Sequence, residues 1–172
     1  TKNKEVALEV SFFKGRITAE VTRYKQTSTD LIFGVPNSAT SGITSVVKNA
    51  GNLTNRGWEV GMNLVPLRYK TFEWSINFNY TQFKSIVDKL APGVTNIFLG
   101  GFTTPNIRLV EGDEYGQIYG NAYQRDAKTG KIIVGANGLP LITSGVQKIG
   151  NPNPKYQIGI TNTFVFKGFN LS

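Results

Sequence analysis

The chain of 172 residues contains no cysteine and no histidine. Without cysteine it can form no disulfide framework, no thiolate nucleophile and no cysteine-ligated zinc site. Without histidine it also lacks the commonest general base and the commonest ligand of transition metals. Because these absences remove the usual tools of most enzyme classes, the sequence predicts a protein that is not an enzyme, has no catalytic or metal-binding residues and needs no cofactor.

Charged residues and long apolar runs are also scarce. Charged residues make up 17% of the chain, compared with about 25% in an average soluble domain. No stretch approaches the ~18 consecutive apolar residues of a membrane-spanning helix, so a helical membrane protein is excluded. The first residues, Thr1–Lys4, contain neither an initiating Met nor the core of a signal peptide, which suggests a piece of a longer chain.

The net charge of +8 raises the question of nucleic-acid binding. A nucleic-acid site would gather Lys and Arg on one surface, where they replace the counterions of the phosphate backbone. In this sequence the basic residues are scattered singly, without the long runs that mark a polybasic arm. We therefore expect no nucleic-acid partner.

Aromatic residues are abundant at 12% of the chain, and this composition favours β-structure. Five segments alternate apolar and polar residues with the period of two that a strand with two different faces requires. The clearest alternation places apolar residues at Phe72, Trp74, Ile76, Phe78 and Tyr80. The predicted strands cover about residues 5–13, 16–27, 57–65, 71–83 and 156–166, and Asn162 interrupts the apolar positions of the last one.

The connections between these segments fall into two classes. The breaks after Phe13, Val65 and Phe166 are a few residues long, whereas the predicted loops 28–55 and 84–155 are long. Short turns on one side and long loops on the other, joined by strands of about ten residues, are typical of outer-membrane β-barrels. The sequence therefore predicts an all-β fold, a fragment of a large antiparallel transmembrane β-barrel with short periplasmic turns and long extracellular loops.

The two faces of the predicted strands differ as a barrel wall requires. The expected lipid-facing residues are Val10, Val60, Trp74, Ile76 and Phe78. The alternate positions would face a hydrated lumen, and they carry Glu9, Arg16, Glu20, Glu59, Asn63, Glu73, Asn77 and Asn79. A soluble β-sandwich that binds carbohydrate or adheres to surfaces alternates in the same way, and a passive porin has the same kind of wall. Both alternatives stay open at this point.

The number and direction of the strands give two further expectations. Five strands fall short of the ~8 that the smallest barrels need, so the chain should not close a barrel by itself. Because segments 71–83 and 156–166 are both bounded by short turns on the same side, they should run antiparallel, with an even number of spanning strands between them. We expect none, because the pieces 117–123 and 131–134 suit a hairpin around Arg125–Lys131, and two spanning strands is the alternative.

Four stretches of the chain carry a family resemblance. They are Glu9–Asp30, Asn49–Val60 (NAGNLTNRGWEV), Glu111–Gly120 (EGDEYGQIYG) and Ile149–Leu171. In this order they resemble segments of the SusC/RagA family of TonB-dependent outer-membrane transporters from Bacteroidota, over nearly the whole chain. The resemblance implies part of a large barrel that imports glycans or peptides across the outer membrane.

The resemblance also implies partners. A SusD-like surface lipoprotein would cap the barrel, and the TonB complex would supply energy through regions that have no match in this chain. The remaining barrel strands and outer-membrane lipid would border the wall. No family motif for substrate contacts is present, so no substrate-binding residue is carried over.

Residues of the long loops offer candidate ligand contacts. The aromatic residues Phe98, Phe102, Tyr115, Tyr119 and Tyr123 could stack on sugar rings, or they could pack the loops together. The acidic group Glu111, Asp113 and Glu114 could act as a glycosidase pair or bind calcium, but neither a desolvating pocket nor the spacing of a calcium loop is evident. We expect solvated loop charges there.

Two cations lie near the long-loop end of segment 16–27. Arg23 and Lys25 occupy apolar-face positions of that strand. Since the apolar band of an outer-membrane barrel is only about 25 Å tall, we expect both side chains to lie above it, where they can reach the phosphates of lipopolysaccharide.

Overall fold

The computed structural model describes residues 1–172, apart from the side chains of Pro36 and Ala39. The strands are β1 (Lys2–Phe12), β2 (Ile17–Pro36), β3 (Ser45–Arg68), β4 (Phe72–Leu90), β5 (Asn96–Gly101), β6 (Asn106–Val110), β7 (Gln117–Gly120), β8 (Gln147–Gly150), β9 (Gln157–Phe166) and β10 (Phe169–Leu171), and a short 3-10 helix covers Ala39–Ser41. Among the described residues, no helix is both long enough and apolar enough to cross a membrane.

The chain packs as two compact units. We call the first the wall unit, and it comprises Thr1–Ser28, Thr54–Ser85 and Pro154–Ser172. We call the second the loop unit, and it comprises Thr29–Leu53 and Ile86–Asn153. The long strands β2, β3 and β4 contribute residues to both units.

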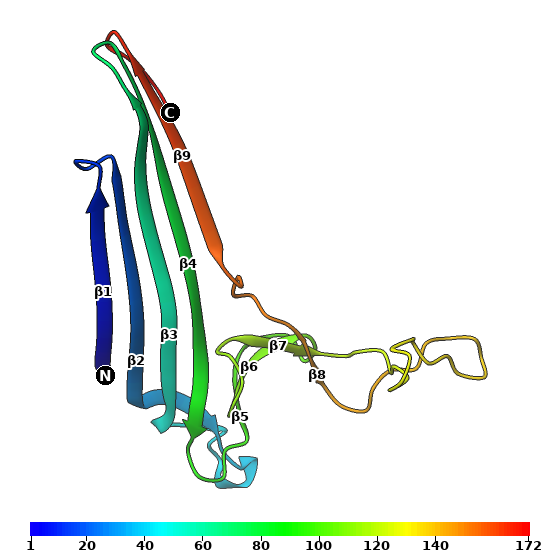
Figure 1. Ribbon diagram of the computed structural model, residues 1–172. Coiled ribbons are helices and arrows are strands. Elements are labelled where there is room, and N and C mark those ends of the chain that lie inside the picture. The colour runs from blue at the N-terminus through cyan, green and yellow to red at the C-terminus, as the bar shows by residue number, and fades with distance from the viewer. The chain divides into compact units, whose positions relative to one another are not determined.

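The wall unit is built on a single six-stranded sheet with the order β1-β2-β3-β4-β9-β10. Figure 1 shows its long strands side by side, from β1 in blue to β9 in red. Because β1 and β10 are the two edges and do not pair with each other, the sheet is open. This confirms the prediction that the chain is a barrel fragment that does not close by itself.

Tight hairpins join neighbouring strands of the wall, as the short sequence breaks predicted. Between β9 and β10, Lys167 and Gly168 both have positive φ, 47° and 89°. Positive φ at both central residues is the mark of a type I′ turn, whose twist matches that of the strands it joins. Between β1 and β2, residues Phe13, Lys14 and Gly15 have φ of 54°, 57° and 82°.

Strand β9 pairs directly with β4 in antiparallel register, from Phe72 opposite Phe166 to Thr81 opposite Gln157. The segment between them adds no strand to the wall and forms a separate sheet with the order β5-β6-β7-β8. The arrangement agrees with the antiparallel direction that the turn lengths predicted. It also agrees with the expectation, drawn from the short pieces 117–123 and 131–134, that no spanning strand lies between the two segments.

The strands are longer than the sequence predicted, so the expected loops 28–55 and 84–155 need correction. Strand β2 continues to Pro36, β3 begins at Ser45 and β4 continues to Leu90. The polar run after Thr27, which the sequence predicts to be a loop, continues β2 and pairs with β3. Thr27 and Thr54 share a hydrogen bond between their hydroxyls at 3.4 Å, and the Asp30 backbone N–H donates to Asn52 at 3.1 Å. Pairing satisfies the backbone groups of this run even though its side chains show no apolar pattern.

The loop unit has its own small apolar core. Its buried residues are Val35, Ala50, Val87, Leu90, Ile97 and Leu109. They come from β2, β3, β4, β5 and β6. The parts of β2, β3 and β4 that belong to the loop unit therefore share one apolar cluster with the separate sheet. Ile97 and Leu109 are paired across β5 and β6.

The hairpin expected around Arg125–Lys131 is present, but its first arm differs from the prediction. Asp126 accepts hydrogen bonds from the backbone N–H groups of Lys128 and Thr129, which fixes the turn. The arms meet at a bridge between Arg125 and Ile132. Residues 117–120 instead form β7, because β6 and β8 supply hydrogen-bonding partners on both sides of this segment.

Candidate functional site

The apolar face of the wall unit contains the five residues that were expected to face lipid. Trp74 lies opposite Phe164 and Phe78 lies opposite Ile160, and Val10 lies opposite Ala19. Val60 and Ile76 are, like the other three, half-buried. The wall unit contains a single sheet, and large apolar side chains such as Leu8 and Ile160 are 64% and 63% exposed.

The polar residue Asn162 also lies on this apolar face, opposite Ile76. The indole N–H of Trp74 donates a hydrogen bond to the side-chain oxygen of Asn162 at 3.2 Å. The Trp74 ring also stacks on Phe164, with 5.8 Å between the ring centroids. The polar group that interrupted the sequence pattern is therefore paired, which lowers the cost of placing it among apolar neighbours.

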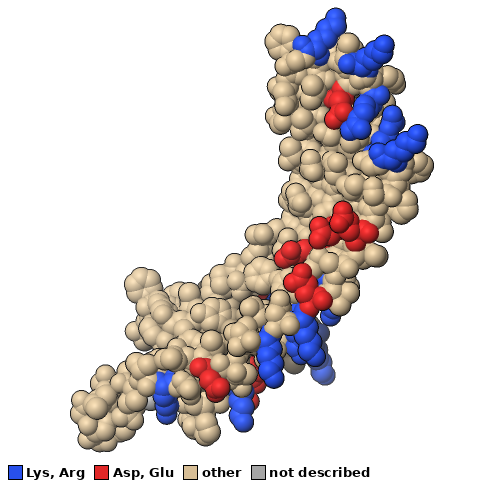
Figure 2. All heavy atoms as spheres, turned by 90° about the vertical axis from the view of Figure 1, so that its left-hand side faces the viewer, with Lys and Arg blue, Asp and Glu red and all other residues tan. Residues whose placement is uncertain are grey.

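The opposite face of the wall is polar and hollowed. A depression of about 210 Å³ is lined by polar residues of β1, β2, β3 and β4, among them Glu9, Glu20, Asn63, Asn77 and Asn79. Glu9 and Glu20 are direct cross-strand partners. Since like charges placed opposite each other are unfavourable unless they are hydrated, this face suits contact with water. On the side of the molecule that Figure 2 views, acidic side chains gather between two groups of lysines and arginines.

On the polar face of the wall, the ring of Tyr24 packs closely over Gly57 of β3. A Cβ atom at Gly57 would lie 2.7 Å from the ring and hydroxyl of Tyr24 and 2.6 Å from the backbone oxygen of Gln82. Tyr24 therefore lies across Gly57, where only glycine leaves room for its ring. Glycine at this position lets strands β2, β3 and β4 pack more closely than any other residue would.

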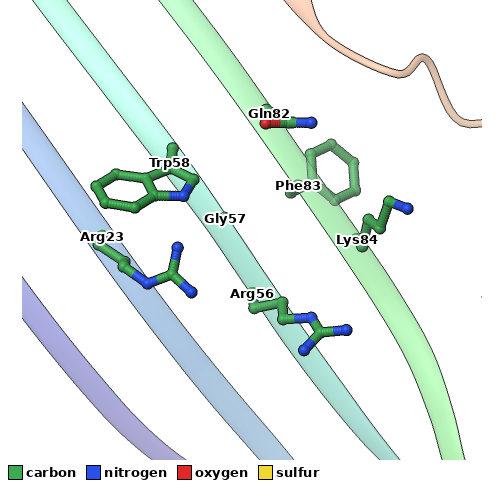
Figure 3. A pocket seen from close by; sticks show the side chains of 7 residues that line it. All are labelled: Arg23, Arg56, Gly57, Trp58, Gln82, Phe83 and Lys84. Atoms are coloured by element: carbon green, nitrogen blue, oxygen red, sulfur yellow. The ribbon is translucent and has the colours of Figure 1, made fainter.

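A basic group lies at the end of the apolar face away from the hairpin turns. Arg23 on β2, Arg56 on β3 and Lys84 on β4 line one pocket of about 200 Å³ together with Trp58 and Gln82. The Arg23 guanidinium lies 4.5 Å from the centre of the Trp58 ring. Figure 3 shows Arg23 reaching toward β3 and Arg56 reaching toward β4.

The sequence predicted only part of this basic group. Arg23 was expected at this end of the face together with Lys25, but Lys25 does not line the pocket. Arg56 and Lys84 were missed. The signal for Arg56 was available, because it occupies the same-face position immediately beyond Trp58.

The acidic group of the loop unit is not a cluster. Glu111 accepts from the Leu90 backbone N–H at 3.2 Å, and Glu114 accepts from the Asn151 amide at 2.6 Å. Asp113 accepts from the Tyr119 hydroxyl and from the Lys148 ammonium. These carboxylates bind separate parts of the loop unit, so the expectation of merely solvated charges needs correction. Among the residues that the structure describes, no group of three or more His, Cys, Asp or Glu is arranged to hold a metal ion.

The Asp113 contacts change its ionisation. Partial burial raises the pKa of the Asp113 carboxyl, but the hydrogen bonds from Lys148 and Tyr119 and the Lys148 charge outweigh it, and the pKa is lowered overall. Burial and the hydrogen bond to Asp113 raise the pKa of the Tyr119 hydroxyl. At neutral pH this junction therefore contains an ionised Asp113 and a neutral Tyr119.

The five candidate aromatic contacts differ in exposure. Phe98, Phe102 and Tyr123 are 51%, 78% and 53% exposed, and Tyr115 is 38% exposed. Tyr119 is only 9% exposed, and its hydroxyl is bound to Asp113. Tyr119 thus packs the sheet and offers no open ring to a ligand, whereas Phe98, Phe102, Tyr115 and Tyr123 keep accessible ring surface.

Comparison with known proteins gives consistent relatives. Residues 1–164 match the family described as "TonB dependent receptor-like, beta-barrel". TonB-dependent receptor P39 of Formosa agariphila is 32% identical over 120 residues, which is 70% of this chain and 11% of that protein. TonB-dependent receptor SusC of Bacteroides thetaiotaomicron is 25% identical over 185 residues, covering 100% of this chain and 18% of SusC. The chain thus spans only a small part of the length of these relatives.

Solved structures agree on the fold. The RagAB peptide transporter superposes with a TM-score of 0.75 and 24% sequence identity, over 98% of this chain and 20% of that one. The RagAB peptide importer in its "open-open" state gives a TM-score of 0.75 and 22% identity. A match over residues 1–164, an open antiparallel wall with one apolar and one polar face, and these relatives lead to one conclusion: the chain belongs to the TonB-dependent receptor β-barrel family.

Proposed function

We propose that this chain is part of the wall and outer loops of an outer-membrane, TonB-dependent importer of glycans or peptides. The observation that carries the proposal is the single sheet of the wall unit, which has one apolar and one polar face. In the proposed orientation the apolar face contacts lipid and the polar face borders a hydrated lumen. Its open edges, β1 and β10, would pair with further strands of the same polypeptide. The chain itself performs no chemistry.

The alternatives receive less support. A soluble sandwich needs a second sheet over the apolar face, and the wall unit consists of one sheet. A passive porin has the same wall, but the family of this chain is that of TonB-dependent receptors. Active import, with energy from the TonB complex through regions outside this chain, is therefore the better supported function.

A surface lipoprotein of the SusD type is the proposed outer partner. The RagAB structures are those of a peptide transporter, and SusC is a relative. In the loop unit, an arm formed by residues 122–143 exposes Val134, Leu139 and Ile142 by 54%, 62% and 55%. Exposed apolar side chains close together mark a protein contact, and we propose that the lipoprotein covers this arm.

A photo-crosslinker at position 139 of the full-length protein tests this contact. It should capture one lipoprotein of constant mass, whose gene lies beside the gene of the transporter. The same crosslinker at Lys128, in the polar turn of the same arm, should capture much less. Equal capture at both positions would contradict a specific contact on the apolar part of the arm.

The orientation of the wall is tested with two neighbouring residues. Phe78→Arg places a charge on the apolar face and should destabilise the folded barrel by about 2–4 kcal/mol at mid-membrane depth. Asn79→Arg places the same charge on the polar face and should change stability little. Stability is measured from unfolding in urea after reconstitution of the full-length protein into bilayers. A larger loss for Asn79→Arg would reverse the assignment of the faces.

The import function is tested in cells that carry the complete gene. Growth on the transported glycan or peptide should require both this protein and an intact TonB complex. Glycan mixtures and peptide mixtures are supplied in separate cultures, and the culture that fails upon gene deletion identifies the substrate class. Growth that persists without TonB would indicate a passive porin.

A further inference from the structure

We propose that Arg23, Arg56 and Lys84 form a binding site for the phosphorylated headgroup of an outer-leaflet glycolipid. The inference rests on the proposed function, because it needs the apolar face of the wall to contact lipid. The site goes beyond import, since it faces away from the lumen. Its ligand would be a structural lipid that holds the wall in the membrane.

The first argument is the position of the cations along three neighbouring strands. The alternating apolar residues of the face end at Val21 on β2 and at Trp58 on β3, and the next same-face residues are Arg23 and Arg56. On β4, Lys84 follows the last aromatic residue of the face after one intervening polar position. A row of cations directly above an apolar band matches the level at which lipid headgroups meet acyl chains.

The second argument is the geometry of the pocket. Arg23, Arg56, Lys84 and Trp58 line one pocket of about 200 Å³, and Figure 3 shows the Arg23 side chain beside the Trp58 ring. Arg23 is held by its contact with the Trp58 ring, 4.5 Å from the ring centre. A guanidinium held against an aromatic ring keeps N–H groups free to donate, and two guanidinium groups that line one pocket suit a phosphate.

The third argument is charge. Within the described part of the chain, neither Arg23 nor Arg56 forms an ion pair with a carboxylate. The pocket lining contains no acidic residue. The like charges of Arg23 and Arg56, which line the same pocket, repel each other, so a phosphate bound between them would stabilise the arrangement.

The apolar surroundings favour a lipid over free phosphate. Trp58 borders the pocket, and Val60 continues the apolar face below it on β3. Acyl chains can pack on this surface while the headgroup binds the cations. Inorganic phosphate would gain only the ionic contacts, which water and salt weaken at an exposed site.

The test measures lipid binding to the full-length transporter in detergent by native mass spectrometry. Bisphosphorylated lipid A should bind the double variant Arg23→Gln/Arg56→Gln at least about tenfold more weakly than the wild type, because charge-assisted hydrogen bonds are lost. Lys14→Gln, which removes a charge at the hairpin end of the wall, should bind like the wild type. Dephosphorylated lipid A should bind the wild type as weakly as the phosphorylated lipid binds the double variant.

Further variants and ligands complete the test. Arg23→Lys/Arg56→Lys keeps the charge but loses the planar donors, and its affinity should lie between those of the wild type and the glutamine variant. Equal binding of lipid A by the wild type and the glutamine variant would overturn the proposal. So would displacement of lipid A by equimolar inorganic phosphate, or equal affinity for phosphatidylglycerol.

Membrane insertion is scored on outer-membrane fractions of cells that carry the same variants, by the shift in gel mobility upon heating. If the wild type is not inserted in the outer membrane, the proposed function fails. If wild type and variants are inserted equally and bind lipid A equally, only the lipid site fails.

Discussion

The indole N–H of Trp74 on β4 donates a hydrogen bond to Asn162 on β9, at 3.2 Å, on the apolar face of the wall. The two residues are far apart in sequence and are brought together by the antiparallel register of the two strands. In lipid, no water would be available to either group if its partner were removed. The pair should therefore stabilise the β4–β9 contact as a unit.

A double-mutant cycle measures this pair. Trp74→Phe should destabilise the reconstituted full-length barrel by about 1–3 kcal/mol, because it leaves the Asn162 amide without this partner among apolar neighbours. The same substitution should cost less in an Asn162→Leu background, because no amide is then left unpaired. Urea unfolding in bilayers provides the free energies, and strictly additive losses would show that the two side chains do not interact.

The close approach of Tyr24 to Gly57 gives a prediction about space. Gly57→Ala should destabilise the wall by about 1–3 kcal/mol, since its Cβ would lie 2.6 Å from the Gln82 backbone oxygen. Gly61 is the matched control on the same strand and face, because a Cβ there meets nothing within 4 Å. Gly61→Ala should be neutral or slightly stabilising. A comparable loss from both substitutions in the same unfolding measurement would contradict the packing at Gly57.

The junction around Asp113 should respond to pH. Its pKa is lowered in the folded chain, so the carboxylate contributes stability above its ordinary pKa, and that contribution disappears as the pH falls through the lowered value. Asp113→Asn should speed hydrogen exchange at the Val87 amide, which donates to the Asp113 backbone oxygen. The effect should be large at neutral pH and vanish in acid. Asp126→Asn in the exposed turn should leave this amide unchanged, and equal protection in wild type and Asp113→Asn at neutral pH would argue against the prediction.

The exposed and buried aromatic residues of the loop unit should behave differently. Phe102→Ala should weaken binding of the transported ligand by about two- to tenfold, the value of one aromatic contact, without changing thermal stability. Tyr119→Phe should lower the stability of the loop unit, because Asp113 loses a hydrogen-bond donor. Isothermal titration and thermal unfolding of the full-length protein separate the two effects. Unchanged ligand affinity in Phe102→Ala would remove this residue from the contact surface.

The sequence by itself determined the class of fold and the two faces of the wall. Apolar and polar residues alternate strictly in segments such as Phe72–Tyr80. This alternation separates them onto two faces only in a strand, because the side chains of a strand point to opposite faces with a period of two. The contrast between short breaks and long connections predicted the side of the hairpins and the antiparallel direction of β4 and β9. These features depend on neighbouring residues along the chain, so a local pattern contains them.

Only the tertiary structure decided where the strands end and which loop residues are structural. The polar run after Thr27 has no apolar period, yet it is a strand because β3 supplies hydrogen-bond partners. Tyr119 resembles the exposed loop aromatics in sequence, but pairing of β7 with β6 and β8 buries it beside Asp113. The grouping of Arg23 with Arg56 and Lys84 depends on the alignment of three strands. Partners that are distant in sequence fix each of these features, and no local pattern records them.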